Sequence, residues 1–177
     1  MNGYSAWLDR LLIQLGQCGP QGRAALQLLV GRRVKVSFHD QPTAARWTLT
    51  GEIQLHPRYL ESGLDDPYPM SLVVHEARHL DQGLFTALSV YGELDAWRVQ
   101  FSLLRSLTGQ YHLDAQHDWT LSRLMSLGLS GDRAMLASAR NLMQDYAGKD
   151  YRVDLLPLYP LPQEIRYFIT RKRMSNV

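Results

Sequence analysis

The stretch "SLVVHEARHLDQG", residues 71–83, places His75 and His79 four positions apart with Glu76 between them. Residues four apart share one face of an α-helix, with Cβ atoms about 6 Å apart. Two imidazole nitrogens in that arrangement can reach one metal ion at about 2.0–2.1 Å. Glu76 follows His75 directly, close enough to reach a metal-bound water without binding the metal itself. The stretch therefore predicts an active-site helix over residues 70–82.

The spacing of apolar residues changes from helical to alternating and back again along the chain. "RVKVSFHD" and "RWTLTGEIQLHP", residues 33–40 and 46–57, alternate in the manner of strands, and Gly51 inside the second is either a bulge or a turn. Helical spacing predicts helices at about 5–17, 21–30, 70–82, 86–107, 115–126 and 132–146, with a short closing helix at 163–171. The predicted fold class is α+β: a small sheet packed on the H-E-x-x-H helix, followed by a mostly helical C-terminal part.

Domain organisation follows from what the sequence lacks. It contains no internal repeats, no low-complexity tract and no Gly/Ser linker. We therefore expect residues 1–177 to form a single compact domain. Its parts are N-terminal helices at 1–32, the sheet with the H-E-x-x-H and ligand-Glu helices at 33–112, and a helical C-terminal part at 113–177.

Composition limits the classes of partner. Of 177 residues 45% are hydrophobic and 20% charged, as in globular proteins, and the formal net charge of +2 is too small to indicate nucleic acid or a membrane as partner. The single cysteine, Cys18, gives no internal disulfide. The N-terminus lacks a signal-peptide layout, and no run is long enough to span a bilayer. These features predict a cytoplasmic protein and leave its oligomeric state open.

A catalytic zinc site needs three protein ligands and an open position for water. Glu93, in "YGELDAW", is the candidate for the third ligand. If the chain turns at Gly83 and the next helix runs antiparallel, His75 lies ~12 Å before the turn and Glu93 ~15 Å after it, at similar height. Asp95 is roughly 200° further around that helix and is the poorer candidate.

"HEARH" followed by "ELDAW" resembles the gluzincin clan of zinc metallopeptidases over roughly residues 51–107. The resemblance implies that His75, His79 and Glu93 bind Zn²⁺, that Glu76 is catalytic, and that the substrate is a peptide or protein whose peptide bonds are hydrolysed. The sequence departs from the clan in two places. Only 13 residues separate His79 from Glu93. Trp97 stands where the thermolysin type has an Asp that supports a ligand histidine.

Other interpretations stay open. The chain could be a non-catalytic or latent zinc-binding module with a peptidase-like fold that recognises a protein partner, with "LYPLPQEIRYFITRKR" covering the cleft. A metal-free helical protein is a weaker possibility, in which the histidines lie on a surface helix and Glu93 pairs with Arg98 or Arg78.

His39 and His56 are expected to be surface or packing residues. The group that stabilises the transition state is left unassigned among six candidates: His112, His117, Tyr91, Tyr146, Tyr151 and Tyr159. The strand that ends near His56 is expected to align an extended peptide.

Overall fold

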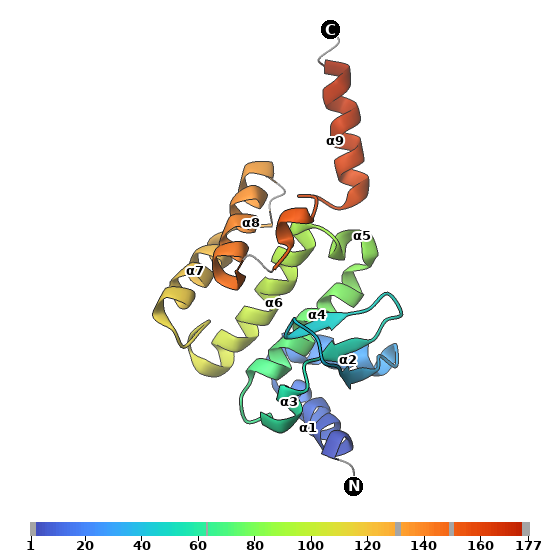
Figure 1. Ribbon diagram of the computed structural model, residues 1–177, viewed down its shortest axis with the longest axis vertical. Helices are drawn as coiled ribbons and strands as arrows, with labels where there is room; N and C mark the ends of the chain where they lie inside the picture. Colours follow the sequence, from blue (N-terminus) through green and yellow to red (C-terminus); the bar gives the residue numbers. More distant parts are fainter. Residues whose placement is uncertain (1–2, 63, 130–131, 149–150, 175–177) are drawn as a thin grey trace. The chain divides into compact units, whose positions relative to one another are not determined.

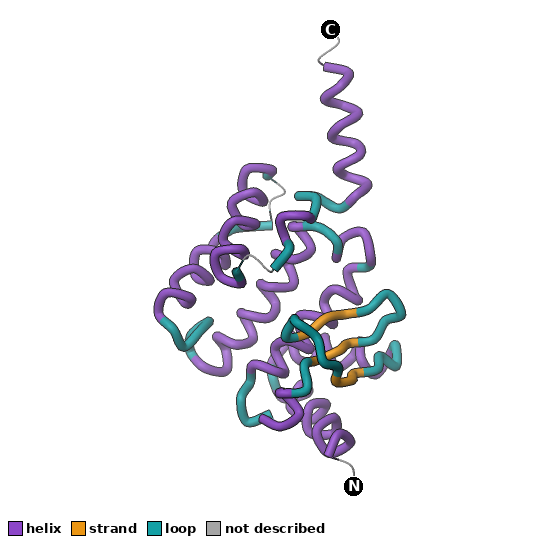
Figure 2. The backbone as a smooth tube through the Cα atoms, viewed as in Figure 1, coloured by secondary structure: helices purple, strands orange, loops and turns teal. Residues whose placement is uncertain are grey.

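The computed structural model describes residues 3–62, 64–129, 132–148 and 151–174. The chain is 68% helical with a small three-stranded mixed sheet, which is an α+β fold (Figures 1 and 2). The elements are α1 Gly3–Gln17, α2 Gly19–Gly31, β1 Val36–Phe38, β2 Ala45–Trp47, β3 Ile53–Leu55, α3 Arg58–Ser62, α4 Tyr68–Gln82, α5 Leu84–Ala87, α6 Val90–Thr108, α7 Ala115–Ser126, α8 Arg133–Ala147, the 3₁₀ turn η1 Val153–Leu155 and α9 Leu161–Met174.

Two compact units share the chain. One comprises Met1–Asp81 and Ala96–His112, and the other comprises Gln82–Asp95 and Leu113–Val177. The boundary falls inside α6, so this one helix belongs to both units. Within the described residues, no helix is both long enough and apolar enough to cross a membrane.

The sheet of the first unit has the strand order β1-β3-β2, with β1 parallel and β2 antiparallel to β3. Gly51, at φ 80°, forms the turn between β2 and β3, and its N–H donates to the Thr48 carbonyl at 2.9 Å. The stretch that alternates over residues 46–57 is therefore a hairpin. The expectation that the strand ending near His56 aligns a substrate is wrong, because β3 is central and its two edges already pair with β1 and β2.

The core of the first unit begins with α1. Trp7, Leu11 and Leu15 recur every four residues and are buried, and the Trp7 indole N–H donates to the Tyr59 carbonyl at 3.1 Å. One hydrophobic cluster joins these side chains to residues from α2, the sheet and α4, among them Leu29, Val36, Ile53, Leu55, Leu72, Val73, Val74 and Ala77. This burial favours a fixed position for the middle of α4.

In the second unit, Asp114 and Asp132 cap α7 and α8 by accepting hydrogen bonds from backbone N–H groups in the first turns. The first turn of α9 is held by Glu164, whose carboxylate accepts from Arg133 Nη1 at 2.9 and 3.1 Å and from the Tyr159 N–H at 3.1 Å. Burial alone raises the pKa of Glu164, but these hydrogen bonds outweigh it and hold the pKa below its usual value.

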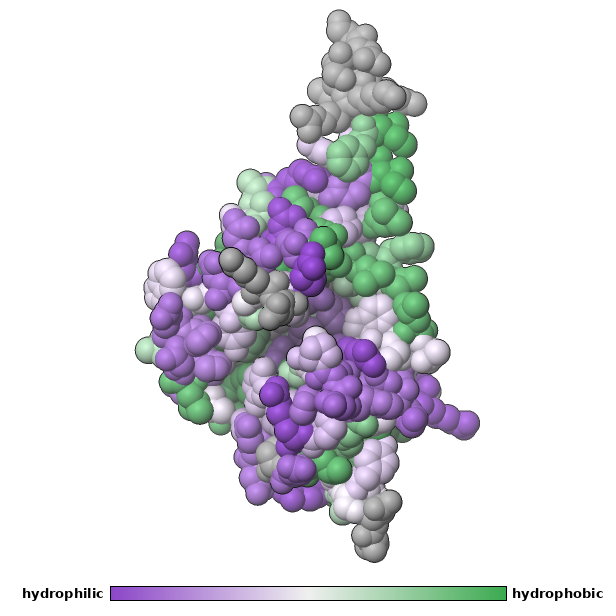
Figure 3. Space-filling view, viewed as in Figure 1, coloured by the Kyte–Doolittle hydropathy of each residue, from purple (hydrophilic) through white to green (hydrophobic). Residues whose placement is uncertain are grey.

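Apolar side chains remain exposed on two neighbouring helices of the second unit, α5 and α9 (Figure 3). They are Leu84 and Phe85 of α5, Leu88 directly after it, and Leu161, Ile165, Phe168 and Ile169 of α9.

The predicted helices are present with bounds close to those expected, with two differences. The stretch 86–107, predicted as one helix, is divided into α5 and α6 at Leu88 and Ser89. The helix α3, Arg58–Ser62, was not predicted, because five residues are too few to show a helical period.

Candidate metal centre

α4 carries the H-E-x-x-H residues, and all three are buried. His75 is 7% exposed, Glu76 6% and His79 2%. Ionisable residues are rarely buried unless they are paired or bind a metal. Their burial argues against the interpretation that the motif lies on a surface helix.

The two imidazole rings point at each other. Their Nε2 atoms lie 3.0 Å apart, and their ring planes are inclined at 77°. Two nitrogens bound to one tetrahedral zinc ion at about 2.0–2.1 Å would lie roughly 3.4 Å apart. The pair thus needs only a few tenths of an ångström of adjustment to hold zinc. The observed Nε2–Nε2 distance of 3.0 Å also suits a hydrogen bond between the two rings. A metal ion would displace the proton that the two nitrogens share.

Trp47 of β2 lies beside this pair. Its ring centroid is 6.2 Å from that of His79, at an interplanar angle of 37°. An indole at this position limits the rotation of the His79 ring and shields it from water. This neighbour could not be predicted from the sequence, because Trp47 lies 32 positions before His79.

Glu93 lies in the first turn of α6, where the otherwise unpaired N–H groups of a helix must find acceptors. Ser89 caps this turn: its hydroxyl accepts from the Gly92 N–H at 3.0 Å and its carbonyl accepts from the Glu93 N–H at 2.9 Å. The N–H groups of Val90 and Tyr91 are bonded as well, to carbonyls of residues 157 and 158. Every amide of this turn up to Glu93 therefore has an acceptor.

Gly92 is required by the close approach of α5 to this turn. A Cβ atom at position 92 would lie 1.9 Å from the Thr86 carbonyl oxygen, a distance no side chain can occupy. Gly83, at φ 75°, makes the turn between α4 and α5 in the conformation that favours glycine.

His75, His79 and Glu93 each offer one ligand atom, and these atoms all lie within 4.8 Å of one another. This is the ligand set predicted from the sequence. Asp95 is not in the group; its carboxylate accepts from Gln82 Nε2 at 2.7 Å. Trp97 is a packing residue, 4% exposed, with its ring 5.4 Å from that of Phe101.

The remaining histidines have other surroundings. His56 Nδ1 accepts from the Arg58 N–H, and its Nε2 lies 3.8 Å from an Asp40 carboxylate oxygen. His112, Asp114 and His117 form a second group whose ligand atoms meet the same 4.8 Å limit, but they are half-buried or exposed. Asp114 already serves there as the cap of α7.

The four tyrosines considered as groups that stabilise the transition state lie in three different surroundings. Tyr151 donates to Glu93, whereas Tyr91 and Tyr159 line a separate cavity of about 720 Å³ in the second unit. Tyr146 stacks edge-on against His117. Tyr151 therefore contacts a predicted site residue directly, and the sequence alone could not have selected it.

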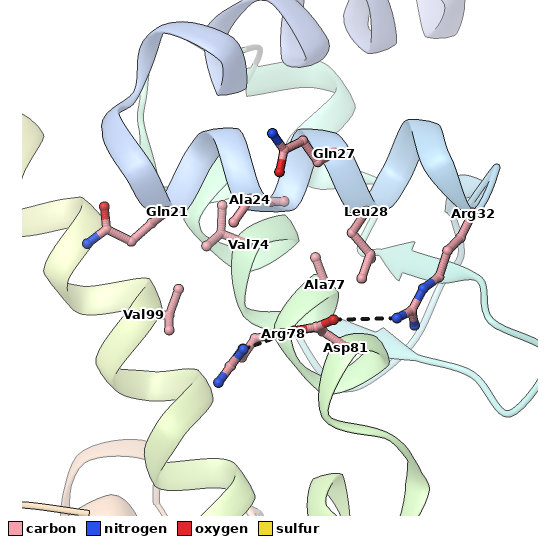
Figure 4. A pocket seen from close by; sticks show the side chains of 11 residues that line it. Gln21, Ala24, Gln27, Leu28, Arg32, Val74, Ala77, Arg78, Asp81 and Val99 are labelled. Atoms are coloured by element: carbon pink, nitrogen blue, oxygen red, sulfur yellow. Dashed lines mark hydrogen bonds and ion pairs between the residues drawn. The ribbon is translucent and has the colours of Figure 1, made fainter.

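The first unit has a pocket of about 370 Å³ between α2 and another face of α4 (Figure 4). Arg32 and Arg78 both reach the carboxylate of Asp81 there, at 3.4 and 3.0 Å. None of the predicted metal ligands lines this pocket.

No family model, curated protein or solved structure matches this chain. The resemblance to gluzincins thus depends on the motif residues alone, and function is inferred from their chemistry.

Proposed function

We propose that this protein is a zinc-dependent metallopeptidase in which His75, His79 and Glu93 hold the Zn²⁺. The observation that carries the proposal is the pair of buried Nε2 atoms 3.0 Å apart on a helix that also bears Glu76. Buried histidines with converging nitrogens and a carboxylate within reach match the donor set of zinc hydrolases.

When bound, zinc would lower the pKa of a coordinated water to about 7 and polarise the carbonyl to be attacked. The protein's own contribution to the reaction is the carboxylate of Glu76. It accepts the proton of the attacking water and then donates it to the leaving amine, as a general base and then a general acid. Its burial excludes competing water from this proton transfer.

The sheet supplies the substrate-binding edge in this proposal, and β2 takes the place first expected for β3. The Thr48 N–H donates to the Glu52 carbonyl and the Ala44 carbonyl accepts from the His56 N–H, at the two ends of β3. Because hydrogen-bonding direction alternates along an antiparallel strand, the backbone groups of Ala45 and Trp47 face the outer edge. Among the described residues β2 pairs only with β3, so an extended peptide can add to that edge beside His79. This arrangement implies that the sheet packs on the H-E-x-x-H helix, as the shared hydrophobic cluster supports.

Metal content and peptide cleavage, measured on the wild type beside Glu76→Gln, test the proposal. We expect the wild type to bind one zinc per chain and to cleave members of a peptide library, detected by mass spectrometry. Glu76→Gln should keep its zinc and lose activity by about 10²–10⁴-fold, because only proton transfer is removed.

The other outcomes separate the alternatives. Zinc without cleavage in the wild type would favour a non-catalytic or latent module that recognises a protein partner. Cleavage that appears only after removal of residues 161–177 would identify the latent form. A wild type that binds no zinc, or a Glu76→Gln variant with full activity, would overturn the proposal.

A further inference from the structure

Tyr151 contacts Glu93 directly. The Tyr151 hydroxyl donates to Glu93 Oε2 at 2.5 Å, across 58 positions of sequence. Hydrogen bonds to a carboxylate are among the stronger ones in proteins, and this one fixes the rotation of the Glu93 side chain. It engages one of the two carboxylate oxygens, Oε2.

The segment that carries Tyr151 also holds the backbone of the same turn. The Val90 N–H donates to the Pro157 carbonyl at 2.9 Å, and the Tyr91 N–H donates to the Leu158 carbonyl at 3.1 Å. Three hydrogen bonds from residues 151–158 thus converge on the turn that contains Glu93. The bond from Tyr151 orients the Glu93 carboxylate, and the bonds to residues 157 and 158 hold the first turn of α6, to which Glu93 belongs.

The supporting segment is itself anchored. Val153, at the start of η1, is 2% exposed, and η1 contacts α8. The Val153 N–H donates to the Tyr151 carbonyl at 2.7 Å, and the Tyr151 N–H donates to the Gly148 carbonyl at 3.1 Å. The N–H and the carbonyl of Tyr151 are therefore both held, which fixes the backbone from which its hydroxyl group reaches Glu93.

We infer that Tyr151 is a positioning residue that orients the Glu93 carboxylate for metal binding; this inference rests on the proposed zinc site. Tyr151 acts through Glu93, to which its hydroxyl group donates. Groups that orient a metal ligand in this way typically change metal affinity by 10–100-fold when removed. This assignment gives the C-terminal part a role in building the site.

The experiment uses the full chain and four variants, with Zn²⁺ affinity measured by competition with a chromophoric chelator. Tyr151→Phe removes only the hydroxyl group and should weaken zinc binding by about 10-fold. Tyr159→Phe is the matched control, because it removes a hydroxyl group nearby and keeps the ring that Arg133 covers. The Co²⁺ absorption spectrum of Tyr151→Phe should also change, since Glu93 would be held differently.

A double-mutant cycle separates positioning from general stability. Glu93→Ala and the pair Glu93→Ala with Tyr151→Phe should bind zinc equally, because the hydroxyl group then has no carboxylate to orient. An equal loss in both backgrounds would overturn the inference, and so would wild-type affinity and spectrum in Tyr151→Phe. A wild type that binds no zinc would overturn the proposed function as well, which makes the two failures distinguishable.

Discussion

The middle of α4 and the first turn of α6 carry the two halves of the candidate site, and they are built differently. On α4 the two histidines are one helical turn apart, so the helix itself brings their nitrogens within 3.0 Å. The turn that holds Glu93 depends on residues from four other places: Thr86, Ser89, Tyr151 and the 157–158 carbonyls. The first half is local in sequence, whereas the second depends on tertiary structure.

The largest expected effect comes from breaking the local half. His79→Ala removes a predicted ligand that is 2% exposed and should weaken zinc binding on the order of 1,000-fold or more. Loss of a ligand is expected to cost more than loss of a group that only orients a ligand, which typically costs 10–100-fold. Isothermal titration with Zn²⁺ measures it. His39→Ala, at a histidine outside both ligand groups, is the control and should bind as the wild type does.

The next largest effect is expected on stability, at the Arg133–Glu164 ion pair that holds the first turn of α9. This helix follows residues 151–158, which support Glu93. Arg133→Met leaves the Glu164 carboxylate buried without its cation and should lower the free energy of unfolding by about 3 kcal/mol. Thermal or urea denaturation measures the change. The double variant Arg133→Met with Glu164→Leu should recover part of the loss, and a double variant as unstable as the single one would contradict the buried-charge explanation.

The same ion pair predicts a dependence on pH. Because the folded pKa of Glu164 lies below its unfolded value, the ionised carboxylate stabilises the fold at neutral pH. That contribution is complete above the unfolded pKa and is lost as the pH falls through the folded one. Urea denaturation between pH 3 and 7 should therefore show a smaller acid-induced loss in Glu164→Gln than in the wild type.

A smaller effect is expected at Gly92. Gly92→Ala must displace the Thr86 carbonyl or the first turn of α6, at a cost of about 2 kcal/mol, and should also weaken zinc binding. Gly31→Ala is the control, because its Cβ would meet no atom within 4 Å. Melting temperature and zinc affinity are measured together, and a Gly92→Ala variant that matches the wild type in both would show that this turn is not tightly fixed.

The smallest effect concerns the β2 edge. Ala45→Pro removes an N–H group that faces away from β3, so the sheet keeps its hydrogen bonds while an added peptide loses one. The loss of one hydrogen bond, about 1 kcal/mol, should raise the KM for peptide cleavage by roughly 5-fold. Ala45→Val keeps the N–H group and should leave KM unchanged. Equal KM values in both variants would exclude this edge as the binding site.

The part of the candidate site on α4, which is local in sequence, could be predicted from the sequence, whereas the tertiary contacts of the first turn of α6 could not. The helix 70–82 and its histidines were predictable because a spacing of four has one meaning on a helix. Glu93 was reached from the turn at Gly83 and the rise per residue. The break between α5 and α6 was missed because no glycine or proline marks it; Ser89, a good N-cap residue three positions before Gly92, was the available signal. Tyr151 could not be chosen from four tyrosines, since only the folded chain brings positions 93 and 151 together.

Gly92 also has a consequence for finding related chains. The motif H-E-x-x-H is short and arises by chance, so it is a poor search query by itself. The packing of α5 on the first turn of α6 demands glycine directly before the carboxylate, and the cap favours Ser or Thr three residues earlier. A query that joins H-E-x-x-H to [ST]-x-x-G-E, with a short spacer between them, should therefore select chains that can build the same turn, which the histidine motif alone would not distinguish from chance matches.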